Sequence, residues 1–174
     1  MQDQNQLRWG ILGAARINER LLPAILEANN AELIAIASRR PGASADTLKK
    51  YAPCYPSIHA YDDLDALLNN PDVQAVYLPM ANHEHAEWAL RAIAHHKHVL
   101  CEKPMALSVA DIDAIAAAAS QNQVKVMEGF MYRFHPQHQR VREILDSGLI
   151  GDIRSVRSSF SFMMRPARMY RLAN

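Results

Sequence analysis

The sequence predicts an α/β protein in which a doubly wound parallel β-sheet carries helices on both faces. Short apolar runs typical of buried strands alternate with segments of helical periodicity, as in successive β–α–β units. A glycine turn joins the first strand to the first helix. The predicted strands cover residues 7–12, 33–37, 57–60, 73–78, 98–101 and 125–127, and their expected order in the sheet is 3-2-1-4-5-6.

Local signals support the individual strands. Residues 33–37 are rich in isoleucine and alanine, as in a strand buried on both faces. Residues 73–78 follow a turn at 69–72 that contains proline and asparagine, and residues 98–101 follow a polar histidine turn. Residues 57–60 form a short third strand between two helical patterns.

Two helices are predicted after the fifth strand. Ser108 and Asp111 form a capping box that begins an alanine-rich helix, and this helix ends near Gln121. A second helix is expected from residue 136 to 147, because its apolar residues share one face and Gly148 follows as a C-terminal stop.

The composition changes after the sixth strand. Residues 153–162 interleave apolar side chains with serine and arginine, which is typical of a strand with one solvated face. The last 21 residues carry five arginines and no acid, a bias that we attribute to half a domain without its acidic partners. We therefore predict a dinucleotide-binding domain over 7–127 and the start of a truncated α+β domain over 128–174.

The overall composition indicates a soluble protein with a sizeable core. Hydrophobic side chains make up 49% of the 174 residues. The net charge of +1 argues against nucleic acid and anionic membranes as partners. Cys54 and Cys101 show no metal or redox spacing, and residues 1–6 lack the features of a secretory signal. We expect a cytoplasmic protein whose partner is a small molecule.

The segment after the first strand has the outline of a Rossmann phosphate-binding loop. In Gly10-Ile11-Leu12-Gly13-Ala14-Ala15-Arg16-Ile17-Asn18, Gly13 begins the turn and the next helix directs backbone N–H groups at a pyrophosphate. Ala15 and Asn18 stand where the G-x-G-x-x-G pattern has its second and third glycines. Taken alone, the segment is explained equally well by an ordinary glycine turn.

The second strand ends in Ser38-Arg39-Arg40, where NAD-binding proteins place a carboxylate. A hydroxyl and two planar guanidinium groups suit a ribose 2′-phosphate and stacking on adenine. The sequence therefore favours NADP(H), with NAD as the alternative cofactor. Two solvated surface arginines are the competing explanation, which we disfavour because the Ser-Arg pair follows Gly13 by 25 residues.

Polar segments also follow the fourth and fifth strands. The fourth is followed by Pro79 to His85, and the fifth by Glu102-Lys103-Pro104. Ligands of open α/β sheets bind outside the carboxyl ends of the strands. Lys103 is the leading catalytic candidate, because an ammonium group donates a hydrogen bond to an alkoxide or carbonyl oxygen. A surface ion pair with Glu102 is the alternative.

Eight histidines raise the question of a metal site, above all His83 with His85 and the group His95, His96 and His98. Side chains at positions i and i+2 of a helix point to different sides, and neither H-E-x-x-H nor a Cys/His finger spacing occurs. We expect no metal, and a polar turn at the histidine group.

Five ordered motifs together resemble the glucose-fructose oxidoreductase, inositol dehydrogenase and rhizopine catabolism family, Gfo/Idh/MocA, over residues 7–174. They are the phosphate loop, the Ser-Arg pair, the P-x-x-N-x-x-H segment, Glu-Lys-Pro, and Glu128-Gly129-Phe130-Met131-Tyr132-Arg133-Phe134-His135-Pro136.

This resemblance implies roles for the matching residues and a cis Lys103–Pro104 peptide. The pyrophosphate would be lined by Gly13, Ala15, Arg16 and Ile17. The adenosine phosphate would be surrounded by Ser38, Arg39 and Arg40. The ribose and nicotinamide would be approached by Pro79, Asn82 and His85, and the reacting carbon by Glu102 and Lys103. The substrate cleft would be bordered by Arg133 and His135.

The resemblance also implies reversible hydride transfer between NADP(H) and a carbinol or carbonyl carbon of a sugar, polyol or cyclic diol. Complete relatives carry a further acid–base residue in a downstream segment that this sequence does not reach. The alternative function is therefore a non-catalytic NADP(H)-binding module or an inactive truncated fragment. Sheet edges of an incomplete second domain are prone to pairing, so a homo-oligomer is compatible with the sequence.

Overall fold

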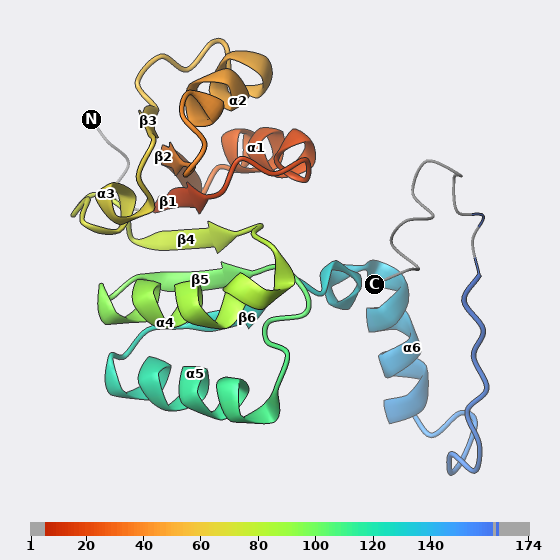
Figure 1. The fold of residues 1–174 in the computed structure, drawn as a ribbon. Coiled ribbons are helices and arrows are strands. Elements are labelled where there is room, and N and C mark those ends of the chain that lie inside the picture. The colour runs from red at the N-terminus through yellow and green to blue at the C-terminus, as the bar shows by residue number, and fades with distance from the viewer. Residues whose placement is uncertain (1–5, 162, 164–174) are drawn as a thin grey trace. The chain divides into compact units, whose positions relative to one another are not determined.

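The computed structural model describes residues 6–161 and 163, which fall into two compact units. The first unit, Met1–Phe130, is built on a parallel sheet with the order β3-β2-β1-β4-β5-β6, which confirms the predicted order (Figure 1). Its elements are β1 (Leu7–Leu12), α1 (Asn18–Glu27), β2 (Ala31–Ala37), α2 (Ala43–Tyr51), β3 (His59–Tyr61), α3 (Leu64–Leu68), β4 (Ala75–Leu78), the 3-10 helix η1 (Asn82–Glu84), α4 (His85–Ala94), β5 (His98–Cys101), α5 (Val109–Gln121) and β6 (Val126–Glu128).

Strands β3, β4 and β6 begin one or two residues later than predicted. At β4, Val73 is buried but belongs to the preceding turn, since its N–H donates to the Asn70 carbonyl at 3.3 Å. The buried Lys97 ammonium donates to the carbonyls of Val73 and Asn70 at 2.7 and 2.8 Å. These bonds use polar groups of Val73 that a strand would pair with its neighbours, so apolar periodicity alone extends β4 too far.

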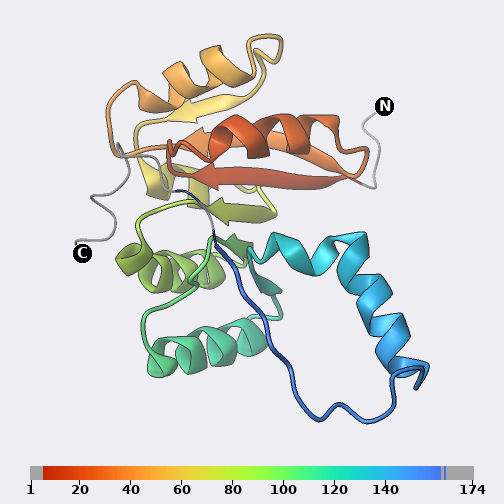
Figure 2. The same ribbon diagram turned by 90° about the vertical axis from the view of Figure 1, so that its right-hand side faces the viewer.

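The sheet is covered on both faces, as a doubly wound fold requires. Neighbouring residues of one strand enter different cores: Ile11 packs with α1 and α2, whereas Leu12 packs with α3, α4 and α5. Tyr77 and Val76 of β4 divide in the same way. Helices α4 and α5 contact each other along one face, and both ribbon views show them side by side (Figures 1 and 2).

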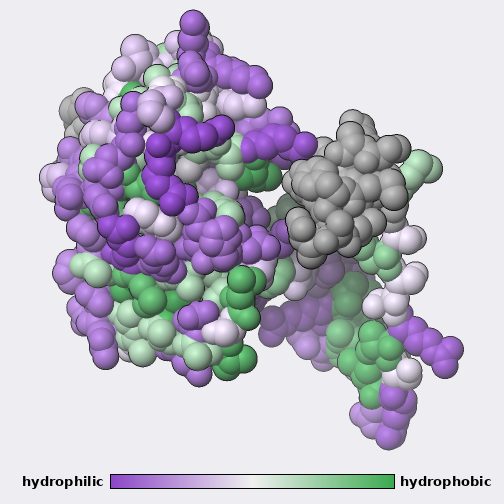
Figure 3. Space-filling model, viewed as in Figure 1, coloured by the Kyte–Doolittle hydropathy of each residue, from purple (hydrophilic) through white to green (hydrophobic). Residues whose placement is uncertain are grey.

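Helix α5 confirms the predicted capping signal. The Ser108 hydroxyl accepts a hydrogen bond from the Asp111 N–H at 3.1 Å and donates to the Asp111 carboxylate at 2.7 Å. The helix then ends at Gln121, as predicted. Its outer side exposes apolar residues, among them Val109 at 77%, and apolar side chains gather over the region of α4 and α5 in the space-filling view (Figure 3).

The second unit, Met131–Asn174, contains the 3-10 helix η2 (Met131–Phe134) and α6 (Pro136–Asp146). Helix α6 and the following Gly148, with φ at +71°, agree with the predicted helix and stop. The division into units falls close to the predicted domain limit at 127/128, and the domain assignment itself stays a prediction.

The predicted strand at 153–162 is wrong for the residues that the structure describes. Residues 153–161 form no strand: among the described residues all strands belong to the first unit, and a strand needs partner strands to be stable. Residue 162 and the arginines at 165, 168 and 171 lie outside the described residues. Within the described part of the chain, no helix is both long and apolar enough to cross a membrane.

The two cysteines are free thiols with opposite environments, so they should differ sharply in reactivity. Cys54 is exposed, whereas Cys101 is fully buried in β5. Burial, with smaller contributions from Glu128 and Glu102, raises the pKa of the Cys101 thiol to about 12. At pH 8 a chromogenic disulfide reagent should therefore label one thiol per native chain, because only the thiolate reacts. Cys54→Ser should abolish this labelling and Cys101→Ser should preserve it; two fast thiols in the native protein would contradict the fold.

Candidate nucleotide-binding site

The loops after four strands meet at one edge of the sheet. The parallel register places Leu12 of β1 beside Ala37 of β2, and Leu78 of β4 beside Cys101 of β5. One residue further on, Gly13 N–H donates to the Ala37 carbonyl at 2.8 Å, and Glu102 N–H donates to the Leu78 carbonyl at 3.0 Å. Predicted site residues far apart in the sequence are therefore neighbours.

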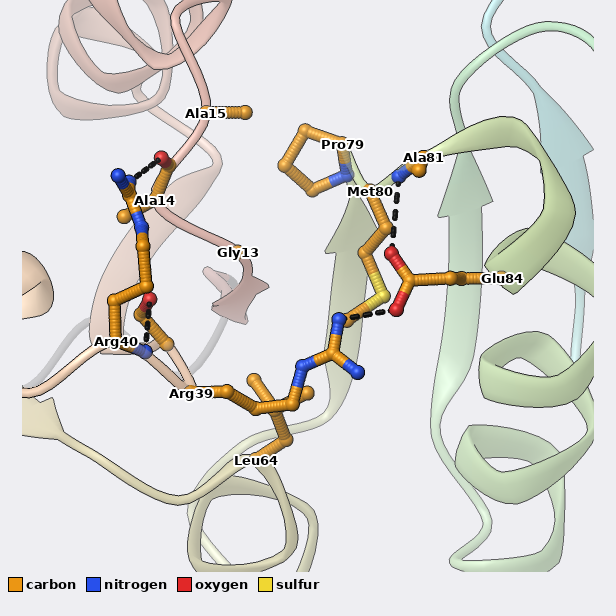
Figure 4. Close-up of a pocket in the computed structure, with 11 residues that line it drawn as sticks. Gly13, Ala14, Ala15, Arg39, Arg40, Leu64, Pro79, Met80, Ala81 and Glu84 are labelled. Carbon is orange, nitrogen blue, oxygen red and sulfur yellow. Dashed lines mark hydrogen bonds and ion pairs between the residues drawn. The ribbon is translucent and has the colours of Figure 1, made fainter.

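A pocket of about 340 Å³ lies at this edge, between the loops that follow β1, β2 and β4 (Figure 4). This volume is within the range of small-molecule sites. The pocket brings together the predicted residues Gly13, Ala15, Ser38, Arg39, Arg40 and Pro79. Its lining also includes residues that the sequence analysis did not assign: Ala14, Leu64, Met80, Ala81 and Glu84.

The loop after β1 is shaped to bind an anion. Gly13 has a φ of +136°, a conformation that residues with a Cβ rarely adopt. Within the described part of the chain, the backbone N–H groups of residues 14–17 donate no hydrogen bond. These free donors directly precede α1, so the positive end of the helix dipole adds to them. The backbone alone therefore supplies donors for a phosphate group.

Asn18, which departs from the glycine pattern, holds this loop in place. Its side chain is fully buried, and its Nδ2 donates to the Gly13 carbonyl at 2.8 Å. Among the described residues, its Oδ1 has no hydrogen-bond partner. A glycine at this position would leave the Gly13 carbonyl without that donor, so the departure from the motif has a structural reason.

Ser38 and Arg40 brace the loop after β2. The hydroxyl of the buried Ser38 accepts a hydrogen bond from the Arg40 N–H at 3.2 Å. The Ser38 backbone N–H donates to the Tyr61 carbonyl at 3.0 Å. The Arg40 guanidinium reaches back to the Ala14 carbonyl at 2.9 Å (Figure 4). Arg40 therefore links the loops after β1 and β2.

Arg39 points the other way and pairs with Glu84 at the far wall of the pocket (Figure 4). Glu84 was not predicted as a site residue, because it is the last residue of η1, six positions after the end of β4, and no sequence motif marks it. Its proximity to Arg39 arises only when the strand order places β4 beyond β1.

His85, expected near the ribose and nicotinamide, is fully buried. Its Nδ1 lies 2.6 Å from the Pro104 carbonyl and its Nε2 lies 3.0 Å from the Met80 carbonyl. Because carbonyl oxygens only accept, each contact is a hydrogen bond when that ring nitrogen carries a hydrogen. His85 thus joins the loops after β4 and β5, which favours a positioning role over direct contact with a ligand.

Three other predicted residues lie outside the pocket lining. Arg16 and Asn82 are exposed at the starts of α1 and η1, and Ile17 is half-buried against the core formed by α1 and α2. Arg133 and His135 belong to the second unit, where the exposed His135 caps α6 by accepting from the Gln137 N–H at 3.1 Å. Their place beside a substrate stays a prediction.

Glu102 and Lys103 follow β5 and lie in different environments. The buried Tyr77 hydroxyl donates to Glu102 Oε1 at 2.8 Å, and burial followed by this bond raises the pKa of Tyr77 well above its usual value. Lys103 is exposed, and its ammonium makes no hydrogen bond or ion pair with the described residues. The alternative for Lys103, a surface ion pair with Glu102, is therefore not found among the described residues. The Lys103–Pro104 peptide is cis, as predicted.

The members of the first histidine group differ in burial: His83 is exposed, whereas His85 is fully buried. In the second group, His96 is exposed and His95 and His98 are half-buried. Among the described residues, no three histidine, cysteine, aspartate or glutamate side chains come together as a group that could hold a metal ion.

His85→Ala should lower the free energy of unfolding by about 2–4 kcal/mol, because it removes the buried ring that contacts the Pro104 and Met80 carbonyls and leaves a cavity. His83→Ala is the matched control: this neighbouring histidine is exposed, so its removal should change the free energy of unfolding by no more than about 0.5 kcal/mol. Urea unfolding followed by circular dichroism measures both. Equal effects of the two substitutions would show that the His85 contacts contribute nothing.

Comparison with known proteins identifies the family of this chain. Residues 7–130 match the family model described as "Oxidoreductase family, NAD-binding Rossmann fold". The chain is 39% identical over 163 residues to dTDP-3,4-didehydro-2,6-dideoxy-alpha-D-glucose 3-reductase of Actinomadura kijaniata, covering 93% of this chain and 48% of the relative. It is also 39% identical to D-xylose 1-dehydrogenase (NADP(+)) 2 of Haloferax volcanii, covering 91% and 47%.

Solved structures agree. A 3-ketoreductase from Actinomadura kijaniata in complex with NADP and TDP-benzene superimposes with a TM-score of 0.77 at 38% identity, covering 86% of this chain and 45% of that chain. A putative myo-inositol dehydrogenase from Sinorhizobium meliloti gives a TM-score of 0.72 at 30% identity, covering 84% and 43%. The chain thus spans about half the length of the relatives that it matches. With the match across most of its length, the chain belongs to the Gfo/Idh/MocA oxidoreductase family.

Proposed function

We propose that this chain forms the cofactor-binding half of an NADP(H)-dependent oxidoreductase that transfers a hydride to or from a sugar, polyol or cyclic diol. One observation carries the proposal: Ala14 and Ala15, whose backbone N–H groups donate no hydrogen bond within the described part of the chain, line the same pocket as a serine and two arginines. Such a pocket has donors for a pyrophosphate and for a ribose 2′-phosphate.

The residues present fit the proposed cofactor. Gly13 would let the cofactor approach the backbone closely, since no side chain fills the turn. A Cβ added at Gly13 would lie 3.5 Å from Pro79 Cγ, its nearest neighbour. No aspartate or glutamate follows β2, where it would accept from the ribose diol of NAD. Ser38 and the guanidinium of Arg39 are the groups that would hold the phosphate.

On this proposal, the nicotinamide supplies or accepts the hydride. The chain's own residues would bind and orient the reactants. Lys103 would donate a hydrogen bond to the substrate oxygen and stabilise negative charge that develops there. Tyr77 holds the Glu102 carboxylate at 2.8 Å, and His85 holds the Pro104 carbonyl. Lys103 therefore projects from a loop that is fixed on both sides.

The substrate class is inferred from the relatives. Beside the xylose dehydrogenase and the 3-reductase, trans-1,2-dihydrobenzene-1,2-diol dehydrogenase of Xenopus laevis is 30% identical over 155 residues. Each of these names refers to a sugar or a cyclic diol, in which ring or chain carbons carry oxygen. Arg133 and His135 would border this substrate. A cytoplasmic location and a homo-oligomeric state are further parts of the proposal, and the free thiols suit a reducing compartment.

The rival function is a module that binds NADP(H) without catalysis, or an inactive fragment. Both functions predict cofactor binding, and only the enzyme predicts turnover. To discriminate the two functions, the full gene product is incubated with NADP⁺ and a panel of sugars, polyols and cyclic diols. Reduction of NADP⁺ at 340 nm supports the enzyme, whereas tight binding with no reduction for any alcohol supports the module.

Arg39→Ala should weaken NADPH binding about 10- to 100-fold, because a charge-assisted contact to the phosphate is lost. NADH binding should change by no more than about twofold, since NADH has no 2′-phosphate. Fluorescence titration of both nucleotides measures the effect. Arg20→Ala, which removes an exposed arginine outside the pocket, controls for net charge. An unchanged NADPH/NADH ratio in Arg39→Ala would count against the phosphate contact.

Lys103→Ala should lower kcat about 100-fold or more, because a donor to the developing oxyanion is lost. The Kd for NADPH should stay within about twofold, since Lys103 does not line the nucleotide pocket. Steady-state kinetics of the gene-encoded protein and titration of NADPH separate the two effects, with exposed Lys49→Ala on α2 as the control. Equal losses in turnover and in cofactor affinity would contradict the assigned role.

A further inference from the structure

Glu84 forms the wall of the pocket opposite the arginines. Its Oε2 accepts a hydrogen bond from the Ala81 N–H at 3.3 Å, while its Oε1 pairs with the Arg39 guanidinium (Figure 4). The Glu84 side chain is 16% exposed and the Arg39 side chain is 60% exposed. The carboxylate is thus the fixed member of the pair, and the long arginine side chain is the member free to change rotamer.

We propose that Glu84 sets the cofactor selectivity of this pocket by competing with the 2′-phosphate of NADP(H) for the guanidinium of Arg39. The inference rests on the proposed function, because it takes a pyridine nucleotide as the ligand. Carboxylate and phosphate oxygens accept hydrogen bonds from the same planar N–H donors. Arg39 therefore leaves Glu84 when it binds the phosphate, and stays paired when NAD(H) binds.

The charges of the pocket make Arg39 the contested group. The charged residues among its described lining are Arg39, Arg40 and Glu84. Arg40 is already committed to the Ala14 carbonyl at 2.9 Å. A phosphate monoester carries a charge of about −1.5 to −2 at neutral pH, so a carboxylate released in the same pocket repels it. Glu84 consequently lowers the affinity for NADP(H) and leaves that for NAD(H) unaffected.

The test replaces Glu84 by glutamine. Glu84→Gln removes the charge but keeps the size of the side chain and an oxygen that accepts from Ala81. Glu87→Gln is the matched control: it removes the same charge from an exposed residue of α4 whose one ion pair among the described residues is with Arg91, at 4.0 Å. Calorimetric or fluorescence titration of the full chain gives the Kd for NADPH and for NADH in each variant.

We expect Glu84→Gln to tighten NADPH binding about two- to fivefold, the range that a partly exposed ion pair supports, with NADH unchanged. In the Arg39→Ala background the same substitution should have a smaller effect than in the wild type, because competition for Arg39 is absent and only the charge repulsion between Glu84 and the phosphate is relieved. Raising the salt concentration should reduce the gain in NADPH affinity in both the wild-type and the Arg39→Ala background.

The outcomes separate this inference from the proposed function. If the wild-type chain binds neither NADPH nor NADH, the proposed function fails. If the wild type binds NADPH but Glu84→Gln matches Glu87→Gln, competition by Glu84 is overturned and the proposed function stands. Selective loss of NADH affinity in Glu84→Gln would also overturn it, since the carboxylate would then be accepting from the ribose hydroxyls. Circular dichroism confirms that each variant is folded.

Discussion

The site depends on the alignment of four parallel strands at their carboxyl ends. Leu12 lies beside Ala37, Ile11 beside Tyr77, and Leu78 beside Cys101. A register shift of one residue in any of these strands would turn its last side chain to the other face of the sheet. Because both faces are covered by helices, the cores on the two sides hold this register, and the loops inherit their positions from it.

Buried polar side chains then fix the loops individually. Asn18 supports the turn at Gly13, Ser38 supports the loop that bears the arginines, and His85 joins the two loops after β4 and β5. Each of these residues is at most 5% exposed. The two side chains proposed to contact the cofactor and the substrate, Arg39 and Lys103, are exposed. Rigidity and reactivity are thereby assigned to different residues of the same loops.

The sequence was informative where local chemistry decides the structure. Apolar runs and Gly13 predicted the strands and the glycine turn after β1, because buried parallel strands and a positive φ restrict the residue types allowed. The order of the strands followed from the rule for doubly wound sheets. The sequence was uninformative where the outcome depends on a distant partner. Glu84 meets Arg39 only through the strand order, and Asn18 looked like a defect in a motif. The alternation at 153–162 predicted a strand, but a strand also needs partner strands, and the described residues of the second unit contain none.

Helix α4 ties together opposite ends of the sheet. His85 is its first residue, and Lys97, three residues after its last, donates to the turn before β4. Detaching the loops after β4 and β5 therefore means unseating a ten-residue helix. The loop after β2 is held differently, through the Arg40 bond to the loop after β1 and through the partly exposed pair of Arg39 with Glu84. The loops after β4 and β5 should accordingly open together with α4, and not independently of it.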